Sequence, residues 1–130
     1  MDFYIDENLP YVVAKALDIL EEHNHTHKVF STELVWGKGI KDRPLIIKLK
    51  EANGIWVTHD LKLITRANEF QLMKKEGITV FIISLPSGYD FTTMYRTIID
   101  RWEEIKRICK KHKHPFICRL LIRGRDPVFL

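Results

Sequence analysis

Three aspartates occupy positions where strands end or a helix begins in the expected order of elements. Asp6 follows the short apolar run at residues 3–5, Asp60 follows the apolar residues 55–59, and Asp42 opens a segment that reads as a helix start. In an open parallel sheet, ligands bind outside the carboxyl ends of the strands. Carboxylates gathered there would repel one another without a cation between them, and such oxygen clusters hold hard cations such as Mg²⁺ and Mn²⁺. The pattern therefore predicts a metal-dependent site that acts on phosphate.

Each aspartate also has a simpler structural explanation. Asp42, with a proline two residues later, matches the pattern of a helix N-cap. Asp60 could cap the helix that follows it, and the acidic pair Asp6-Glu7 could be a cap or a solvated pair. It is the coincidence of all three aspartates at one edge of the sheet that favours the site.

The charge of the chain is unevenly distributed. Residues 1–100 contain 12 Lys and Arg against 14 Asp and Glu, whereas residues 101–130 contain 9 against 3. A basic patch beside an acidic metal site suits a polyanionic substrate, although Lys and Arg are also common at the solvated end of a long helix. On the first interpretation, the substrate-binding candidates in the basic run are Lys106, Arg107, Lys110 and Lys111.

Strands alternate with helices along the chain. The sequence predicts strands over residues 3–5, 27–32, 55–59, 78–83 and 116–122. Between them, apolar residues at helical spacing predict helices that begin near Pro10, near Asp42, near Leu63 and after Asp90. This alternation indicates βαβ units, and so an α/β fold with a mostly parallel sheet and right-handed crossovers.

Four details of these helices are specific enough to test. Residues 12, 13, 16, 17 and 20 are expected to form one apolar stripe, and the second helix is expected to close at Gly54. A single helix is expected from Leu63 to Glu76, ending at Gly77. In the last helix, Trp102 fits the apolar stripe and is expected in the core.

Size and composition indicate one domain spanning residues 1–130. No apolar run approaches the roughly 20 residues of a membrane span, so no membrane association is expected. The two cysteines, Cys109 and Cys118, form neither a disulfide framework nor a metal-ligand pair. Reduced, buried thiols are the expectation, and they fit a cytoplasmic protein.

Several segments resemble a known family. The opening residues 3–10, Phe-Tyr-Ile-Asp-Glu-Asn-Leu-Pro, are similar to the first strand and turn of PIN-like domains. Residues 55–60 are similar to the family's apolar strand ending in Thr-x-Asp, and Asp42 falls where these domains place their second acid. Segments around Arg66 and Glu69, at residues 77–81 and around Trp102 resemble the VapC-type toxin branch.

The resemblance implies a three-layer α/β/α fold and a Mg²⁺- or Mn²⁺-dependent ribonuclease. It also implies a toxin that is held inactive by a cognate antitoxin protein. The acids carried over as metal ligands are Asp6, Asp42 and Asp60, and Glu69 matches a further family acid of second rank. Residues placed to hold RNA phosphates near these acids are Lys38, Lys41, Arg43 and Arg66.

Two other kinds of protein compete with the ribonuclease. In a receiver-like signalling domain, Asp60 would be the phosphoacceptor and Asp6 with Glu7 would bind Mg²⁺, but Asp42 would have no role. A catalytically inactive PIN-like scaffold would bind RNA or a protein without cleavage. The sequence does not identify the RNA target, the number of metal ions or the oligomeric state, and a homodimer is one of the states it leaves open.

Overall fold

The computed structural model describes residues 1–24, 27–85, 88–121 and 126–130. Its sheet has the strand order β2-β1-β3-β4-β5-β6. Neighbouring strands from β2 to β5 are parallel, and β6 joins β5 in the antiparallel sense. The strands are β1 (Asp2–Ile5), β2 (Lys28–Ser31), β3 (Ile55–Thr58), β4 (Thr79–Ile83), β5 (Ile117–Leu120) and β6 (Val128–Phe129).

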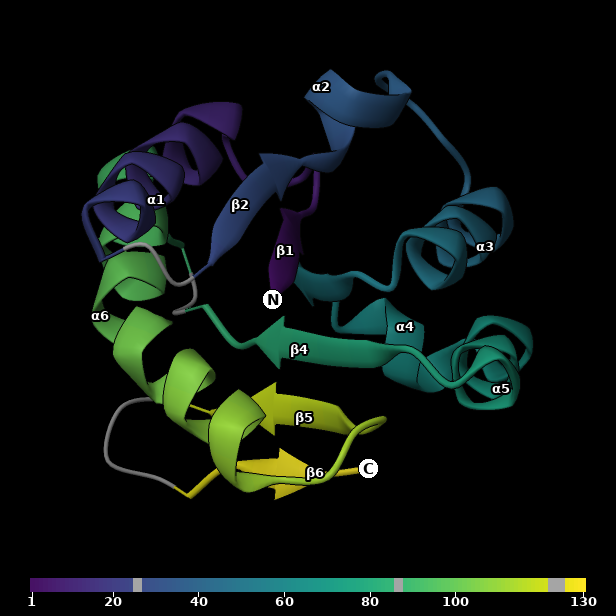
Figure 1. Ribbon diagram of the computed structural model, residues 1–130. Helices are drawn as coiled ribbons and strands as arrows, with labels where there is room; N and C mark the ends of the chain where they lie inside the picture. The colour runs from purple at the N-terminus through teal and green to yellow at the C-terminus, as the bar shows by residue number, and fades with distance from the viewer. Residues whose placement is uncertain (25–26, 86–87, 122–125) are drawn as a thin grey trace.

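Helices cover both faces of this sheet, which gives three layers (Figure 1). On one face lie α1 (Tyr11–Asn24) and α6 (Phe91–Lys111); on the other lie α3 (Asp42–Ala52) and α5 (Ala67–Glu76). Two short helices, α2 (Thr32–Trp36) and α4 (Lys62–Thr65), sit in the connections after β2 and β3. The predicted α/β class, mostly parallel sheet and three-layer arrangement are therefore confirmed.

Each face of the sheet has its own apolar core. The core under α1 and α6 includes Phe3, Val57, Phe81 and Trp102, and the core under α3 and α5 includes Trp56. The four residues of β3 and the five of β4 are all buried. This explains why these strands lack apolar-polar alternation, since both of their faces are covered.

Several sequence predictions about single residues are confirmed. Trp102 is buried, and so are both free cysteines, whose pKa burial raises to about 12. Asp90 is the N-cap of α6, where its side chain accepts a hydrogen bond from the Thr93 backbone N–H at 2.8 Å. Gly77 closes α5 in the left-handed conformation, with φ of 68°.

The end of α3 differs from the prediction. The residue in the left-handed conformation is Asn53, with φ of 52°, and not Gly54. Gly54 is needed for a different reason, because a Cβ atom there would lie 2.5 Å from the ring of Tyr4. That ring stacks on Trp36 at 4.7 Å between centroids, so it has little room to move.

The apolar stripe of α1 is also rotated from its predicted position. Val13 and Leu17 are buried as expected, but Val12, Ala16 and Leu20 are exposed. The buried face continues instead through Glu21, which is 1% exposed. Its carboxylate accepts a hydrogen bond from the Trp102 indole at 2.8 Å and pairs with Lys106 at 2.6 Å. Because Trp102 and Lys106 on α6 provide these partners, the charged side chain of Glu21 can be buried.

Other differences concern the connections. The helix predicted over residues 63–76 is divided into α4 and α5 at Arg66, whose extended backbone ends one helix and precedes the other. Helix α2 and strand β6 were not predicted. The last predicted strand, 116–122, is observed as β5, and residue 122 lies outside the described residues. Among the described helices, none has the length and apolar character that a membrane span requires.

Candidate functional site

The candidate site lies where the strand order reverses between β1 and β3. From β1, the chain reaches β2 on one side and β3 on the other. In doubly wound sheets, ligands bind at this switch point, outside the carboxyl ends of the strands. Asp6 directly follows β1, and Asp60 comes two residues after β3. The backbone N–H of Asp6 donates to the Val57 carbonyl at 2.9 Å, which holds the end of β1 against β3.

Thr58, the last residue of β3, connects two of the aspartates. Its buried hydroxyl donates to Asp6 Oδ2 at 2.8 Å and accepts from the backbone N–H of Asp60 at 3.1 Å. Because the hydroxyl has one hydrogen, which goes to Asp6, its oxygen is left to accept from donors such as the Asn8 amide at 3.4 Å. Thr58 therefore joins the Asp6 carboxylate to the backbone of Asp60, a role that the sequence analysis did not assign to it.

Arg66 joins the second aspartate to the third. Its Nη1 lies 3.0 Å from Asp42 Oδ2 and 3.5 Å from Asp60 Oδ2. Asp42 is not the N-cap of α3, because Lys41 holds that position and makes no side-chain cap bond. Asp60 does make a local turn bond, from the Lys62 backbone N–H to Oδ1 at 3.0 Å. Asp42 and Asp60 thus share one guanidinium, while Asp6 is joined through Thr58 to the backbone of Asp60.

The carboxylates also affect one another electrostatically. Burial raises the pKa of Asp6 to about 6; the charges of Asp42 and Glu7 add to this, while the hydrogen bond from Thr58 opposes it. Burial also raises the pKa of Asp42, although Arg66 opposes the shift, and the charges of Asp60 and Glu69 raise it further. Asp42 therefore lies close enough to Asp6, and Asp60 and Glu69 close enough to Asp42, for their charges to repel one another.

The loop before α3 is held beside the aspartates by Glu7. Its Oε2 accepts a hydrogen bond from the Gly39 backbone N–H at 2.8 Å. Gly39 has φ of 83°, a conformation that favours glycine. The exposed side chains of Lys38, Lys41 and Arg43 flank this attachment. These predicted phosphate-binding residues therefore belong to the aspartate edge of the sheet.

The basic C-terminal end of α6 lies at the opposite end of the strands, where the strands begin. After α6, His114 contacts Thr79, the first residue of β4, at 2.9 Å, so the helix ends near the starts of the strands. Arg107, Lys110 and Lys111 are exposed there, while Lys106 is paired with the buried Glu21. The expectation that this patch lies beside the acidic site is wrong, because α6 runs the length of the sheet away from the carboxyl ends of its strands.

The donor chemistry of the site fits a hard cation, since carboxylate oxygens are the ligands that Mg²⁺ and Mn²⁺ prefer. Within the described part of the chain, however, no three His, Cys, Asp or Glu side chains form a group arranged to hold a metal ion. Arg66 explains this arrangement in part, because it pairs with two of the three aspartates. A metal ligated by Asp6, Asp42 and Asp60 would have to compete with this guanidinium.

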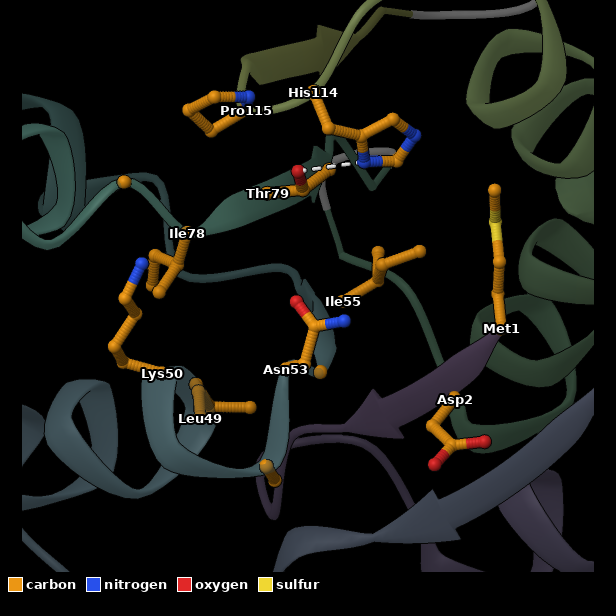
Figure 2. Close-up of a pocket in the computed structure, with 13 residues that line it drawn as sticks. Met1, Asp2, Leu49, Lys50, Asn53, Ile55, Ile78, Thr79, His114 and Pro115 are labelled. Atoms are coloured by element: carbon orange, nitrogen blue, oxygen red, sulfur yellow. Dashed lines mark hydrogen bonds between the residues drawn. The ribbon is translucent and has the colours of Figure 1, made fainter.

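Of the cavities in the described part of the chain, two lie at opposite ends of the sheet strands. One, of about 320 Å³, adjoins the aspartates and is lined by Asn8, His59, Asp60, Leu61, Lys62, Leu85 and Tyr89. The other, of about 530 Å³, lies at the starts of β1, β3 and β4. Figure 2 shows Lys50 and Asn53 from the end of α3 on one wall of the larger cavity and the Thr79–His114 hydrogen bond on the other. None of the predicted site residues lines it.

Some residues of the aspartate edge were not identified from the sequence. Asn8 and His59 stand beside the predicted acids, and their proximity to Asp6 and Asp60 along the chain was the available signal. Tyr89 precedes α6 and carries no sequence pattern that links it to the site. Only the fold brings Tyr89 next to His59, with ring centroids 5.7 Å apart.

The comparison with known families agrees with this fold. The model of the PIN-like domain matches residues 1–85, which contain every predicted acid. The chain therefore belongs to the PIN-like domain family. Proteins with this domain are often nucleases, which supports that general kind of activity. No curated protein and no solved structure shows significant similarity to the chain.

Proposed function

We propose that this protein is an endoribonuclease that depends on Mg²⁺ or Mn²⁺ and hydrolyses phosphodiester bonds of RNA. The observation that carries the proposal is the network at the β1/β3 switch point of a PIN-like fold, in which Thr58 joins Asp6 to the Asp60 backbone and Arg66 pairs with Asp42 and Asp60. Structural explanations account poorly for this network, because Asp42 is not a cap and Asp6 is a buried acid whose pKa is raised.

The three aspartates would hold the cation, with Glu69 close enough to influence Asp42 electrostatically. When bound, such a cation lowers the pKa of a bound water and stabilises charge on the scissile phosphate. Thr58 orients the Asp6 carboxylate and is bonded to the backbone of Asp60, and Lys38, Lys41 and Arg43 would supply positive charge for neighbouring phosphates. Arg66 would hold phosphate once a metal displaces it from the aspartates.

The biological role that we propose is the toxin of a toxin–antitoxin pair acting in the cytoplasm. Its support is the resemblance of the segments around Arg66, Glu69 and Trp102 to VapC-type toxins. Expression of the protein in a bacterial host should arrest growth, and an antitoxin encoded beside it should relieve the arrest. Growth that is unaffected by an actively cleaving enzyme would contradict the toxin role and leave the ribonuclease standing.

A test of the activity uses Asp6→Asn, Asp42→Asn and Asp60→Asn. Each should lower metal-dependent cleavage of single-stranded RNA by about 100-fold or more, because several kcal/mol of charge stabilisation depend on the cation and each ~1.36 kcal/mol changes the rate tenfold. Asp100→Asn, on an exposed part of α6, is the matched control. Folding of each variant is checked by thermal melting. Full activity in two of the three site variants would exclude the site.

The alternative of an inactive scaffold is favoured by one observation, the ion pairs of Arg66 with Asp42 and Asp60. In such a protein, Arg66 would permanently take the place of the cation, and the chain would bind RNA without cleaving it. RNA binding by the purified protein, with no cleavage in Mg²⁺ or Mn²⁺, would establish that alternative. A receiver-like protein would instead be labelled by an acyl phosphate donor at Asp60, which the same preparation can test.

A further inference from the structure

The cavity beside the aspartates has the composition of a binding site for a planar ring. We call it the edge pocket; it is lined by Asn8, His59, Asp60, Leu61, Lys62, Leu85 and Tyr89. Its volume of about 320 Å³ lies at the small end of the range for ligand sites, roughly 300–1,000 Å³. Two aromatic rings and two leucines supply apolar contact, while the remaining lining residues carry polar or charged groups.

The rings of His59 and Tyr89 meet edge to face, at 73° between planes. Tyr89 is 38% exposed, so a large part of its side chain is available to a ligand. His59 Nε2 lies 3.0 Å from the backbone carbonyl of Asn8, which can only accept. Nε2 therefore carries the hydrogen of this bond, which fixes the orientation of the ring at the pocket.

The edge pocket is physically continuous with the candidate site. Asp60 belongs to both, since it lines the pocket and pairs with Arg66. Asn8 connects them a second time, because its carbonyl holds the His59 ring while its amide contacts the Thr58 hydroxyl. Lys62, which also lines the pocket, adds a positive charge that suits the phosphate of a nucleotide.

We propose that the edge pocket holds one unstacked base of a single-stranded RNA, next to the phosphodiester bond that is hydrolysed at the aspartates. This inference rests on the proposed ribonuclease function and names its substrate class. Proteins that bind single strands stack bases on aromatic side chains, and such stacking tolerates any base. A base that is paired within a duplex cannot enter the pocket, so the protein discriminates against double-stranded RNA.

The test measures binding without cleavage. Single-stranded RNA oligonucleotides that each carry one 2-aminopurine, placed at successive positions, are titrated with the protein in EDTA. Stacking on Tyr89 quenches the fluorescence of the probe at one position. Tyr89→Ala should abolish that quenching and weaken binding by about 5- to 150-fold. Tyr89→Phe should restore both, because it keeps the ring.

The matched control is Tyr11→Ala, which removes a tyrosine of similar exposure, 44%, that does not line the pocket. It should leave quenching and affinity unchanged. The same RNA annealed to its complement should bind weakly and show no quenching that depends on Tyr89. Thermal melts establish that each variant is folded.

The outcomes separate the pocket from the proposed function. Quenching that is lost only in Tyr89→Ala, in a protein that never cleaves RNA, would keep the pocket and contradict the ribonuclease. Cleavage with equal binding by the parent, Tyr89→Ala and Tyr11→Ala would contradict the pocket and keep the ribonuclease. Equal affinity for single-stranded and duplex RNA would also overturn the inference.

Discussion

At the scale of single residues, the three aspartates are not equivalent. Asp6 is 8% exposed and bound to a hydroxyl, whereas Asp42 and Asp60 are more accessible and share a guanidinium. Burial penalises the charged form of Asp6 most. Asp6 is therefore the acid whose ionisation costs the metal-free protein most.

This difference predicts how stability changes with pH. Because the pKa of Asp6 is about 6 when folded and about 3.9 when unfolded, the folded state binds more protons between these values. The free energy of unfolding therefore falls as pH rises from about 4 to 6. In EDTA at pH 8, Asp6→Asn should be more stable than the parent by up to about 3 kcal/mol. At pH 4 the two should be nearly equal.

Urea denaturation in EDTA at pH 4, 6 and 8 measures these differences. Asp100→Asn, an exposed substitution on α6, should show no such trend relative to the parent. A loss of stability in Asp6→Asn that is the same at all three pH values would mean that the Thr58 hydrogen bond, and not the charge, dominates at this position.

Arg66 gives a second prediction at this scale. Arg66→Gln removes the cation that pairs with Asp42 and Asp60, so a divalent metal no longer competes with it. We expect Mg²⁺ to stabilise the variant more than the parent, since the gain follows RT ln(1 + [L]/Kd). In EDTA the variant should lose at most about 1 kcal/mol, because the pairs are partly exposed.

Thermal melts in EDTA and in millimolar Mg²⁺ provide the measurement. Arg43→Gln is the control, since Arg43 is an exposed arginine close in sequence to Asp42. Identical Mg²⁺ responses in the parent and in Arg66→Gln would show that Arg66 does not compete with a metal at this site.

At the scale of elements, the junction between α3 and β3 depends on two adjacent residues with different requirements. Gly54→Ala should destabilise the protein by about 1–3 kcal/mol, because the added methyl group overlaps the packed Tyr4 ring. Asn53→Gly should leave stability unchanged or raise it, since glycine adopts the left-handed conformation freely. Denaturant unfolding of both variants compares the two effects, and a neutral Gly54→Ala would show that Tyr4 can move aside.

Elements were most predictable where local pattern and burial coincide. Strands β3 and β4 were found from their continuous apolar runs, and α6 from its long amphipathic spacing with Asp90 at its start. The rotation of α1 was missed because its buried face includes Glu21. A charged residue reads as a surface position in a sequence until its partners on another helix are known.

At the scale of the whole molecule, the acidic candidate site and the basic end of α6 lie at opposite ends of the sheet strands. The acids and the edge pocket lie at the carboxyl ends of the strands, and the basic end of α6 lies at the other edge. Residues Arg107, Lys110 and Lys111 remain proposed RNA contacts, but only an RNA long enough to reach across the molecule could touch both regions. Lys106 is unlike them, because it neutralises a buried carboxylate.

This separation predicts an effect that depends on RNA length. Changing Arg107, Lys110 and Lys111 to Gln should weaken binding of long single-stranded RNA and reduce its salt dependence, with the slope falling by about 0.7 for each phosphate that the protein no longer neutralises. Cleavage of a short oligonucleotide that reaches only the aspartates should keep its rate. Binding across a salt series, with long and short RNA, tests this. Equal effects on both lengths would contradict the separation.

The sequence by itself determined the alternation of the main strands and helices and the mostly parallel sheet, and it predicted that three aspartates lie at one end of that sheet. These follow from local information, because apolar runs, capping residues and glycines act over a few neighbouring positions. The tertiary structure alone decided that Arg66 pairs with two aspartates, that Tyr89 meets His59 and that the basic helix end is remote. Most of these contacts join residues more than twenty positions apart, and they depend on side-chain packing between elements that no local pattern encodes.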